Sequence, residues 1–178
     1  PKDFTTAMLI PAKMVNGKMV YAEDTSTVYV SDRLYQNNGG KFTDVTKKAN
    51  VAGGKECSVG AVWVDYDNDS FLDLYVGNYL EFDPDYKYYY APDGFPGPMA
   101  YDAQKDILYH NNGDGTFEDV TEKMGIKDID GRAMGVGAAD YDEDGFVDIF
   151  VANDHTLNYL WHNEGGKGFT DKGTMSGT

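Results

Sequence analysis

The stretch "DYDEDGFVD", residues 140–148, places five acidic side chains in nine positions. A second copy, "DYDNDSFLD", occupies residues 65–73 and contains four aspartates. Carboxylates held this close together repel one another, and ionisation of one disfavours ionisation of the next. So much negative charge in a short span indicates either a fully solvated acidic turn or a bound cation.

Short apolar runs flank both acidic stretches. "VGAVWVD" (59–65) enters the first and "LDLYVGN" (72–78) leaves it, while "GVGAAD" (135–140) and "VDIFVAN" (147–153) flank the second. Runs of this length that are rich in Val, Ile, Tyr and Phe indicate half-buried strands. Fourteen tyrosines and twenty-one glycines also favour strands and tight turns. Each acidic stretch is therefore predicted to be a hairpin loop in an all-β protein.

Another phrase occurs three times. It reads "RLYQNNGGKFTDVT" from Arg33, "ILYHNNGDGTFEDVT" from Ile107 and "YLWHNEGGKGFTDK" from Tyr159. Each copy predicts a short strand, a turn rich in Asn and Gly, and a second strand that starts at Phe. An acidic hairpin and one such phrase together make a unit of four strands.

The spacing of these motifs reveals a repeat and an interruption. Leu34 precedes Asp65 by 31 residues, and Leu108 precedes Asp140 by 32. In the other half of the unit, Asp65 precedes Leu108 by 43 residues, whereas Asp140 precedes Leu160 by only 20. The excess of 23 residues is an insertion, and the uninterrupted unit is 52 residues long. This length is typical of the blades of a β-propeller.

We therefore predict part of a β-propeller built from four-stranded blades of about 52 residues with calcium-binding hairpin loops. Residues 31–178 are expected to form about two and a half to three blades, with an insertion at 79–106. Residues 1–30 match the repeat poorly and are interpreted as a separate N-terminal segment, with a degraded blade as the alternative. Since propellers usually have four to eight blades, 178 residues hold only part of one.

The acidic loops have the chemistry of calcium sites, because Ca²⁺ takes six to eight oxygen ligands. Each loop offers carboxylates at positions 1, 3, 5 and 9 and a backbone carbonyl at position 7. We predict two sites, one per loop. The predicted ligands are Asp65, Asp67, Asp69, the carbonyl of Phe71 and Asp73 in one loop, and Asp140, Asp142, Asp144, the carbonyl of Phe146 and Asp148 in the other.

The loops differ from an EF-hand, which needs a Glu at position 12 and a helix on each side. Position 12 is Val76 in one loop and Val151 in the other, and both fall in predicted strands. Position 6 is Gly145 in the second loop but Ser70 in the first. Because a sharp turn at this position favours Gly, the first site is expected to be strained or weaker.

Composition excludes several classes of protein. The net charge of −15 argues against a nucleic-acid partner, which would require clustered Lys and Arg. No window of eighteen apolar residues predicts a membrane span. The single cysteine, Cys57, excludes an internal disulfide and is interpreted as a small buried apolar residue. His110 and His162 occupy equivalent repeat positions, which favours a structural or hydrogen-bonding role over catalysis.

Three segments carry a family resemblance: "GAVWVDYDNDSFLDLYVGN", "GVGAADYDEDGFVDIFVAND" and "LYHNNGDGTFEDVT". They resemble the FG-GAP/VCBS repeats of integrin-alpha-like β-propellers. Among these, the motifs are most similar to those of bacterial ASPIC/UnbV and cartilage acidic protein-like propellers. The resemblance covers roughly residues 31–172. It implies that the acidic loop lies in a blade hairpin and binds calcium. It also implies a protein of the extracellular space, cell surface or periplasm that serves adhesion or assembly without catalysis.

We therefore expect a non-enzymatic, calcium-binding module for protein–protein interaction, adhesion or scaffolding. The insertion at 79–106 contains six tyrosines and four prolines, and we expect it to contact a protein partner or a neighbouring part of a larger assembly. A loop that only covers a blade edge is the alternative. An enzyme or lectin that acts on carbohydrate is the alternative function, because propellers host both classes.

Overall fold

The structure is a computed structural model of the 178-residue chain. It describes the backbone of residues 4–6, 12–15 and 18–21, and residues 32–54, 56–81, 97–127 and 129–176. The chain divides into two compact units, Pro1–Glu56 and Cys57–Thr178, which are described separately.

The first unit contains a small antiparallel sheet with strand order β1-β4-β5 and a separate β2-β3 hairpin. The first of the three turns rich in Asn and Gly, at residues 37–40, joins β4 to β5 as predicted. A single helical turn, α1, follows and ends at Asn50, whose φ of 62° lies in the left-handed region. The elements are β1 (Phe4–Thr6), β2 (Ala12–Val15), β3 (Lys18–Tyr21), β4 (Leu34–Asn37), β5 (Phe42–Asp44) and α1 (Thr46–Ala49).

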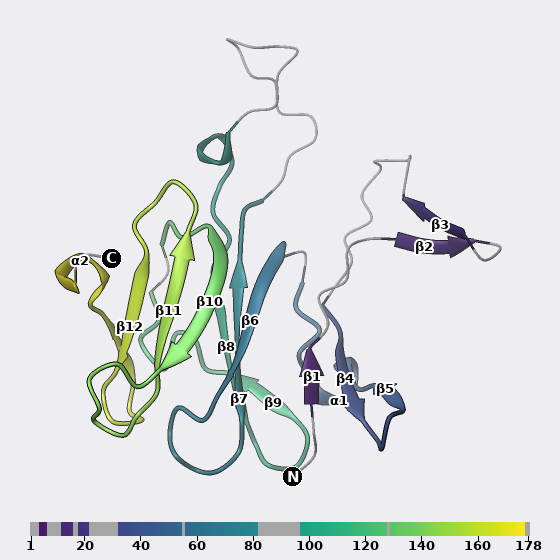
Figure 1. Ribbon diagram of the computed structural model, residues 1–178, viewed down its shortest axis with the longest axis horizontal. Coiled ribbons are helices and arrows are strands. Elements are labelled where there is room, and N and C mark those ends of the chain that lie inside the picture. The colour runs from purple at the N-terminus through teal and green to yellow at the C-terminus, as the bar shows by residue number, and fades with distance from the viewer. Residues whose placement is uncertain are drawn as a thin grey trace. The chain divides into compact units, whose positions relative to one another are not determined.

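The second unit consists of two four-stranded antiparallel sheets, in each of which strand order follows chain order (Figure 1). We call them the first blade and the second blade. The first contains β6 (Ser58–Val64), β7 (Asp73–Asn78), β8 (Ile107–Asn111) and β9 (Phe117–Asp119). The second contains β10 (Ala133–Ala139), β11 (Asp148–Asn153), β12 (Tyr159–Asn163) and β13 (Phe169–Asp171). The short helices are η1 (Pro98–Ala100) and α2 (Gly173–Ser176). The predicted all-β fold with four-stranded propeller blades is confirmed.

The two blades share one register. Val64 pairs with Asp73 at the end of the β6–β7 hairpin, and Ala139 pairs with Asp148 in the same place in the β10–β11 hairpin. Both hairpins also carry an irregularity near the start of their first strand. Residues at equivalent positions of the repeat therefore occupy equivalent places in the fold. As a result, the acidic loops after β6 and β10 lie at the same end of the two blades, at the bottom in Figure 1.

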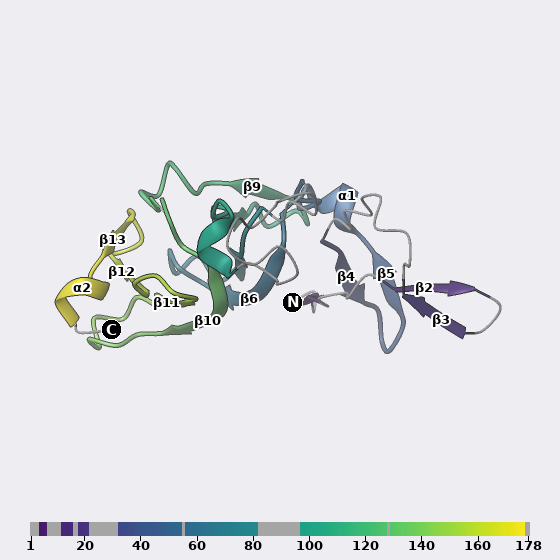
Figure 2. The same cartoon turned by 90° about the horizontal axis from the view of Figure 1, so that it is seen from above.

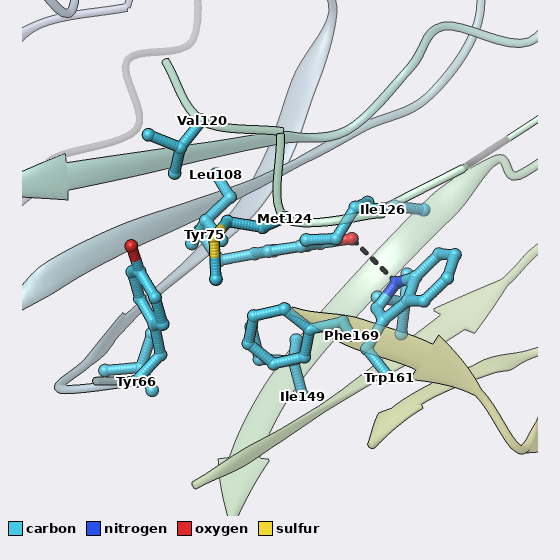
Figure 3. Close-up of a cluster of buried hydrophobic side chains, with 12 residues drawn as sticks. Tyr66, Tyr75, Leu108, Val120, Met124, Ile126, Ile149, Trp161 and Phe169 are labelled. Atoms are coloured by element: carbon cyan, nitrogen blue, oxygen red, sulfur yellow. Dashed lines mark hydrogen bonds between the residues drawn. The ribbon is translucent and has the colours of Figure 1, made fainter. Parts of the chain in front are cut away.

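The core of the second unit lies between the two blades, where β10 runs next to β6 (Figure 2). Because side chains alternate along a strand, each blade has two faces. We call the face of the first blade that packs against the second blade its following face. The face of the second blade that packs against the first is its preceding face, and equivalent positions of the repeat carry the same names. From the first blade and the turn after it, the core takes Val64, Tyr66, Tyr75, Leu108, Val120, Met124 and Ile126; from the second it takes Ala133, Ile149, Val151, Trp161 and Phe169 (Figure 3).

The blades approach each other closely at Gly77. A Cβ atom added there would lie 2.7 Å from Cγ2 of Val136 and 2.9 Å from Cβ of Ala133, so only Gly fits. Nearby, Trp161 Nε1 donates a 3.1 Å hydrogen bond to the hydroxyl of Tyr75, drawn as the dashed line in Figure 3. That hydroxyl donates in turn to the buried carboxylate of Asp106 at 2.7 Å. The interface is thus both apolar and hydrogen-bonded.

The two roots of the predicted insertion belong to the first blade. Leu80 forms a bridge with Ala103, and the backbone N–H of Glu81 donates to the carbonyl of Asp102 at 2.8 Å. These contacts extend the β7–β8 pair beyond the blade. The rest of the insertion, 82–96, lies outside the described residues. The predicted boundary between an N-terminal segment at 1–30 and the blades from residue 31 onward also stays a prediction.

Two sequence-based expectations concern isolated features. Cys57 is exposed, so the prediction that it is a buried apolar residue is wrong. It precedes β6 by one residue, where no apolar alternation specifies which way a side chain points. Among the described residues, no helix is long and apolar enough to cross a membrane.

Candidate metal sites in two acidic loops

The second acidic loop (residues 140–148) is folded by its own aspartates. Oδ1 of Asp140 accepts a hydrogen bond from the backbone N–H of Asp144 at 3.1 Å, and its Oδ2 accepts from Gly145 at 2.9 Å. Asp144 Oδ1 accepts from the N–H of Phe146 at 2.8 Å. Short side chains that bind backbone N–H groups a few residues ahead are typical of tight turns. The sequence thus closes this loop without regular secondary structure.

The first acidic loop (residues 65–73) repeats these contacts. Asp65 accepts from the N–H groups of Asp69 at 3.1 Å and Ser70 at 3.0 Å, and Asp69 accepts from Phe71 at 2.8 Å. Ser70 takes the place of Gly145 with a φ of 74°, against 91° for the glycine. A residue with a Cβ atom is strained in this region of φ, as the sequence predicts for position 6.

The last aspartate of each loop is buried. The exposed fraction is 0% for Asp73 and 2% for Asp148. Asp73 accepts from the N–H of Tyr66 at 3.3 Å and of Asn111 at 2.8 Å. In the second blade, Asp148 accepts from the N–H of Tyr141 at 3.1 Å and of Asn163 at 2.8 Å. Each closing carboxylate is therefore held by both its own loop and the third strand of its blade.

The carboxylates converge as the spacing predicts. One oxygen each from Asp65, Asp67 and Asp73 lies within 4.8 Å of the others, and the same holds for Asp140, Asp142 and Asp144. Asp69 falls in a group with Asp67 and His110, and Asp148 falls in one with Asp142 and His162. All eight predicted aspartates thus take part in these clusters. The carbonyl ligands predicted for Phe71 and Phe146 stay predictions.

The clustering leaves uncompensated negative charge in the first loop. Burial raises the pKa of Asp73 to about 7, and the charge of Asp67 adds to the rise. The pKa of Asp67 is itself raised, by burial first and then by the charge of Asp69. Burial, followed by the charges of Asp73 and Asp67, raises the pKa of the Tyr66 hydroxyl. Such shifts arise where carboxylates share a site, and a cation among them would favour the ionised forms.

Two histidines lie against the loops. Nδ1 of His110 lies 3.2 Å from Oδ1 of Asp73 and 3.6 Å from Oδ2 of Asp67. Nδ1 of His162 has the same distances to Asp148 and Asp142. In the described part of the chain, no Lys or Arg forms an ion pair with these aspartates. The hydrogen-bonding role predicted from the repeat positions is confirmed, but sequence reasoning did not connect the histidines to the acidic loops.

Two asparagines brace the loops, and sequence reasoning missed both. Asn111 Nδ2 donates to the carbonyl of Leu72 at 2.9 Å, and Asn163 Nδ2 donates to that of Val147 at 3.1 Å. Their Oδ1 atoms accept backbone N–H groups from the following turns, at Gly113 and Gly166. The signal was present as the first Asn of each "HNN" or "HNE" motif.

The phenylalanine at position 7 of each acidic loop lies beside a glycine of the next turn. A Cβ atom added to Gly113 would lie 2.9 Å from Cζ of the Phe71 ring. In the second blade, one added to Gly165 would lie 3.9 Å from Cε2 of Phe146. The ring of each acidic loop thus rests beside the Asn-Gly turn of the same blade. Both recurring motifs therefore belong to one local structure.

The donor set fits a hard divalent cation. Four carboxylates per loop offer oxygen ligands, which suit Ca²⁺ and Mg²⁺, and the loop geometry lets them adjust to the six to eight oxygens of Ca²⁺. Val76 and Val151 lie in β7 and β11 and are 7% and 0% exposed, so position 12 supplies no ligand as it would in an EF-hand. The clusters are compatible with calcium held within a β-hairpin.

A model of the FG-GAP-like repeat family matches residues 99–151, which include the whole second acidic loop. Residues 99–151 therefore contain an FG-GAP-like repeat. Since the match runs from η1 to β11, the FG-GAP unit overlaps both blades. At a coarse level, an FG-GAP repeat is typical of a protein-interaction module of β-propeller type.

The chain is also similar to curated relatives. It is 37% identical to Cartilage acidic protein 1 of Xenopus tropicalis over 84 aligned positions, which cover 40% of this chain and 13% of the relative. It is 37% identical to Cartilage acidic protein 1 of Homo sapiens over 67 positions, which cover 32% of this chain and 10% of the relative. The chain thus matches about an eighth or less of the length of these relatives.

Proposed function

We propose that the chain is a calcium-stabilised, non-enzymatic β-propeller module for protein–protein interaction, adhesion or scaffolding in an extracytoplasmic assembly. One observation supports the calcium sites above the others. Two separate loops each bring oxygens of three aspartates within 4.8 Å of one another, and each buries its last aspartate, at 0% exposure for Asp73 and 2% for Asp148. An acidic turn needed only for solubility would gain nothing from a buried carboxylate.

Each loop would hold one Ca²⁺ through its four aspartates and its position-7 carbonyl. Bound calcium would supply the positive charge that these clusters lack. Because the ligands converge only in the folded hairpin, binding free energy becomes folding free energy. The protein's own residues prepare the site: Asn111 and Asn163 hold the loop backbone, and His110 and His162 orient the closing carboxylates through their Nδ1 atoms. Such outer contacts commonly fix the geometry of metal ligands.

The proposed setting follows from charge and from the relatives. The net charge of −15 suits a cation-binding role, and extracellular calcium modules bind with Kd on the order of 0.1–1 mM. The curated relatives carry the name cartilage acidic protein, which agrees with this setting. For the partner, we propose contact through the tyrosine-rich insertion at 79–106, with carbohydrate as an alternative ligand.

Calorimetry tests the calcium sites. Isothermal titration of the chain with Ca²⁺ should give two sites, and the melting temperature should be higher in calcium than in EDTA. Asp144→Ala should remove one site and leave the first loop's site intact. Glu143→Gln is the matched control, since it removes one negative charge from the same loop at a position that is not a predicted ligand. It should retain both sites. Equal melting temperatures in calcium and EDTA would contradict the proposal.

A further inference from the structure

The two acidic loops are in direct contact where the blades pack together. Nδ2 of Asn68, at position 4 of the first loop, donates a 3.1 Å hydrogen bond to the carbonyl of Gly145, at position 6 of the second. Asn68 lies between Asp67 and Asp69, two of the predicted ligands. The N–H of Gly145 donates at 2.9 Å to Oδ2 of Asp140, a predicted ligand of the other site. One hydrogen bond therefore connects the ligand-bearing segments of both loops.

Asn163 forms a second connection between the loops. It lies on the preceding face of the second blade, is 1% exposed, and reaches Tyr66 on the following face of the first. Its N–H donates to Asp148 at 2.8 Å, while its Nδ2 donates to the carbonyl of Tyr66 at 2.8 Å. The N–H of Tyr66 donates in turn to Asp73 at 3.3 Å. The buried closing carboxylates of the two loops are therefore linked through Asn163 and Tyr66.

The turn after β12 packs against the first loop. A Cβ atom added to Gly166 would lie 3.1 Å from Cα and 3.4 Å from Cβ of Asp67. The N–H of Gly166 donates to Oδ1 of Asn163 at 2.8 Å. Because closely packed groups transmit strain, movement of Asp67 is coupled to movement of this turn and of Asn163.

We propose that the two loops bind calcium cooperatively, and that Asn68 and Asn163 position the ligands of both sites. This inference rests on the calcium sites of the proposed function and adds their regulation. Without a cation, the carboxylates of each loop repel one another, and gathering them restricts the loop. Once the second loop is ordered, the Gly145 carbonyl is a fixed acceptor for Asn68, and Asn163 holds the carbonyl of Tyr66. The first loop then loses less conformational freedom when it binds, so its affinity is higher, and the effect is reciprocal.

The charges of the two sites act in the opposite direction. A cation in one loop cancels negative charge that attracts a cation to the other, which lowers the second affinity. This effect acts through solvent and is screened, with a Debye length of about 8 Å at 0.15 M ionic strength. The hydrogen bonds of Asn68 and Asn163 join the loops directly, at 3.1 and 2.8 Å. The coupling is therefore positive at physiological salt and should grow as the salt concentration rises.

Isothermal titration of the chain and of two single-site variants measures the coupling. Asp69→Ala leaves only the second site, and Asp144→Ala leaves only the first. For independent sites, the product of the two dissociation constants of the unmodified chain equals the product of the constants of the two variants. We expect the product for the unmodified chain to be smaller by a factor of about five or more, as is typical of coupled sites. We call this ratio the coupling factor.

Asn68→Gly tests whether the direct contact carries the coupling. Glycine suits the φ of 59° at this position, and the substitution removes the amide while it retains all four aspartates of the loop. The coupling factor should fall at least about twofold, which corresponds to the loss of one weak hydrogen bond. Glu143→Gly is the matched control, because Glu143 has the same position in the second loop and a φ of 62°. It leaves the bonds of Asn68 and Asn163 in place and should retain the coupling factor.

Amide hydrogen exchange follows the transmitted ordering itself. In Asp69→Ala, whose first site is removed, calcium in the second loop should slow exchange of the Ser70 N–H, which donates to Asp65 at 3.0 Å. The slowing should be smaller when Asn68→Gly is combined with Asp69→Ala. Circular dichroism of each variant checks that it is folded.

Four results would overturn the proposal: a coupling factor of one or less, a factor that Glu143→Gly lowers as much as Asn68→Gly does, a factor that disappears as salt is raised, or unchanged exchange of the Ser70 N–H. Two independent sites would refute the coupling and leave the proposed calcium sites standing. A chain that binds no calcium would refute both.

Discussion

The side-chain amide of Asn163 donates a 2.8 Å hydrogen bond to the backbone carbonyl of Tyr66, a residue of the first acidic loop. The same amide donates to the carbonyl of Val147 in the second acidic loop at 3.1 Å. Asn163 is only 1% exposed. One buried side chain therefore holds both loops, and the blades are joined at the end where the metal ligands converge.

We expect Asn163→Ala to destabilise the second unit more than Asn111→Ala does. Asn111 braces only the carbonyl of Leu72, whereas Asn163 braces one carbonyl in each loop. An unpaired buried carbonyl costs about 1–3 kcal/mol, so the free energies of unfolding should differ by about that amount. Urea denaturation of both variants in EDTA measures the difference. Equal losses would show that the bond between the blades contributes nothing beyond the brace within each loop.

The sequence predicts the hairpins and the eight clustered aspartates because both depend on local spacing. Alternating apolar residues and Asn-Gly turns determine the strands, and the odd positions of one short loop determine which carboxylates point inward. The role of His110 could not be predicted in this way. It lies 37 residues after Asp73 and meets it only because Leu74 pairs with Tyr109 across β7 and β8. The link between Asn163 and Tyr66 spans 97 residues and depends on how two blades pack.

Ser70→Gly should stabilise the first acidic loop. Ser70 has a φ of 74°, a region where a side chain is strained and Gly is not. Its backbone N–H donates to Asp65, and the substitution retains that bond. We expect a gain of about 1 kcal/mol in the free energy of unfolding in EDTA. In the opposite direction, Gly145→Ala at a φ of 91° should lose a similar amount. A loss on Ser70→Gly would mean that the serine hydroxyl stabilises the loop more than the strain costs.

Tyr79 should make stability depend on alkaline pH. Its hydroxyl donates to Asp154 Oδ2 at 2.7 Å, and burial together with this bond raises the pKa of Tyr79 from 10.0 to about 12. The folded state therefore retains a proton that the unfolded chain loses above pH 10. This contribution to stability is fully present below pH 10 and is lost as pH rises toward 12.

Urea denaturation of the unmodified chain and of Tyr79→Phe at several pH values checks this prediction. The difference between their free energies of unfolding should be constant near neutral pH and should shrink between pH 10 and 12. The phenylalanine variant keeps the ring and removes only the titrating group. If both proteins lose stability with the same slope, the hydroxyl of Tyr79 titrates alike in the folded and unfolded states.

The C-terminal root of the insertion is bound to a buried arginine of the second unit. Arg132 is 4% exposed, and its guanidinium donates from Nε to the carbonyl of Pro98 at 3.1 Å and from Nη2 to that of Tyr101 at 2.8 Å. The buried guanidinium therefore depends on the C-terminal root of the insertion for two of its acceptors. It also pairs with the carboxylate of Asp130 at 2.8 Å, a contact that no change to the insertion removes.

Two replacements by a short Gly-Ser linker separate the roots from the tyrosine-rich stretch between them. Replacing 80–104 should cost about 1–3 kcal/mol or more, because Arg132 then loses two hydrogen bonds while it stays buried. Replacing 82–96 retains both acceptors and the pairing of Glu81 with Asp102, so the free energy of unfolding and calcium binding should not change. Urea denaturation and calcium titration of the two variants measure this. If the shorter replacement destabilises the chain as much as the longer one, the stretch is part of the fold, and the proposal that it contacts a partner is wrong.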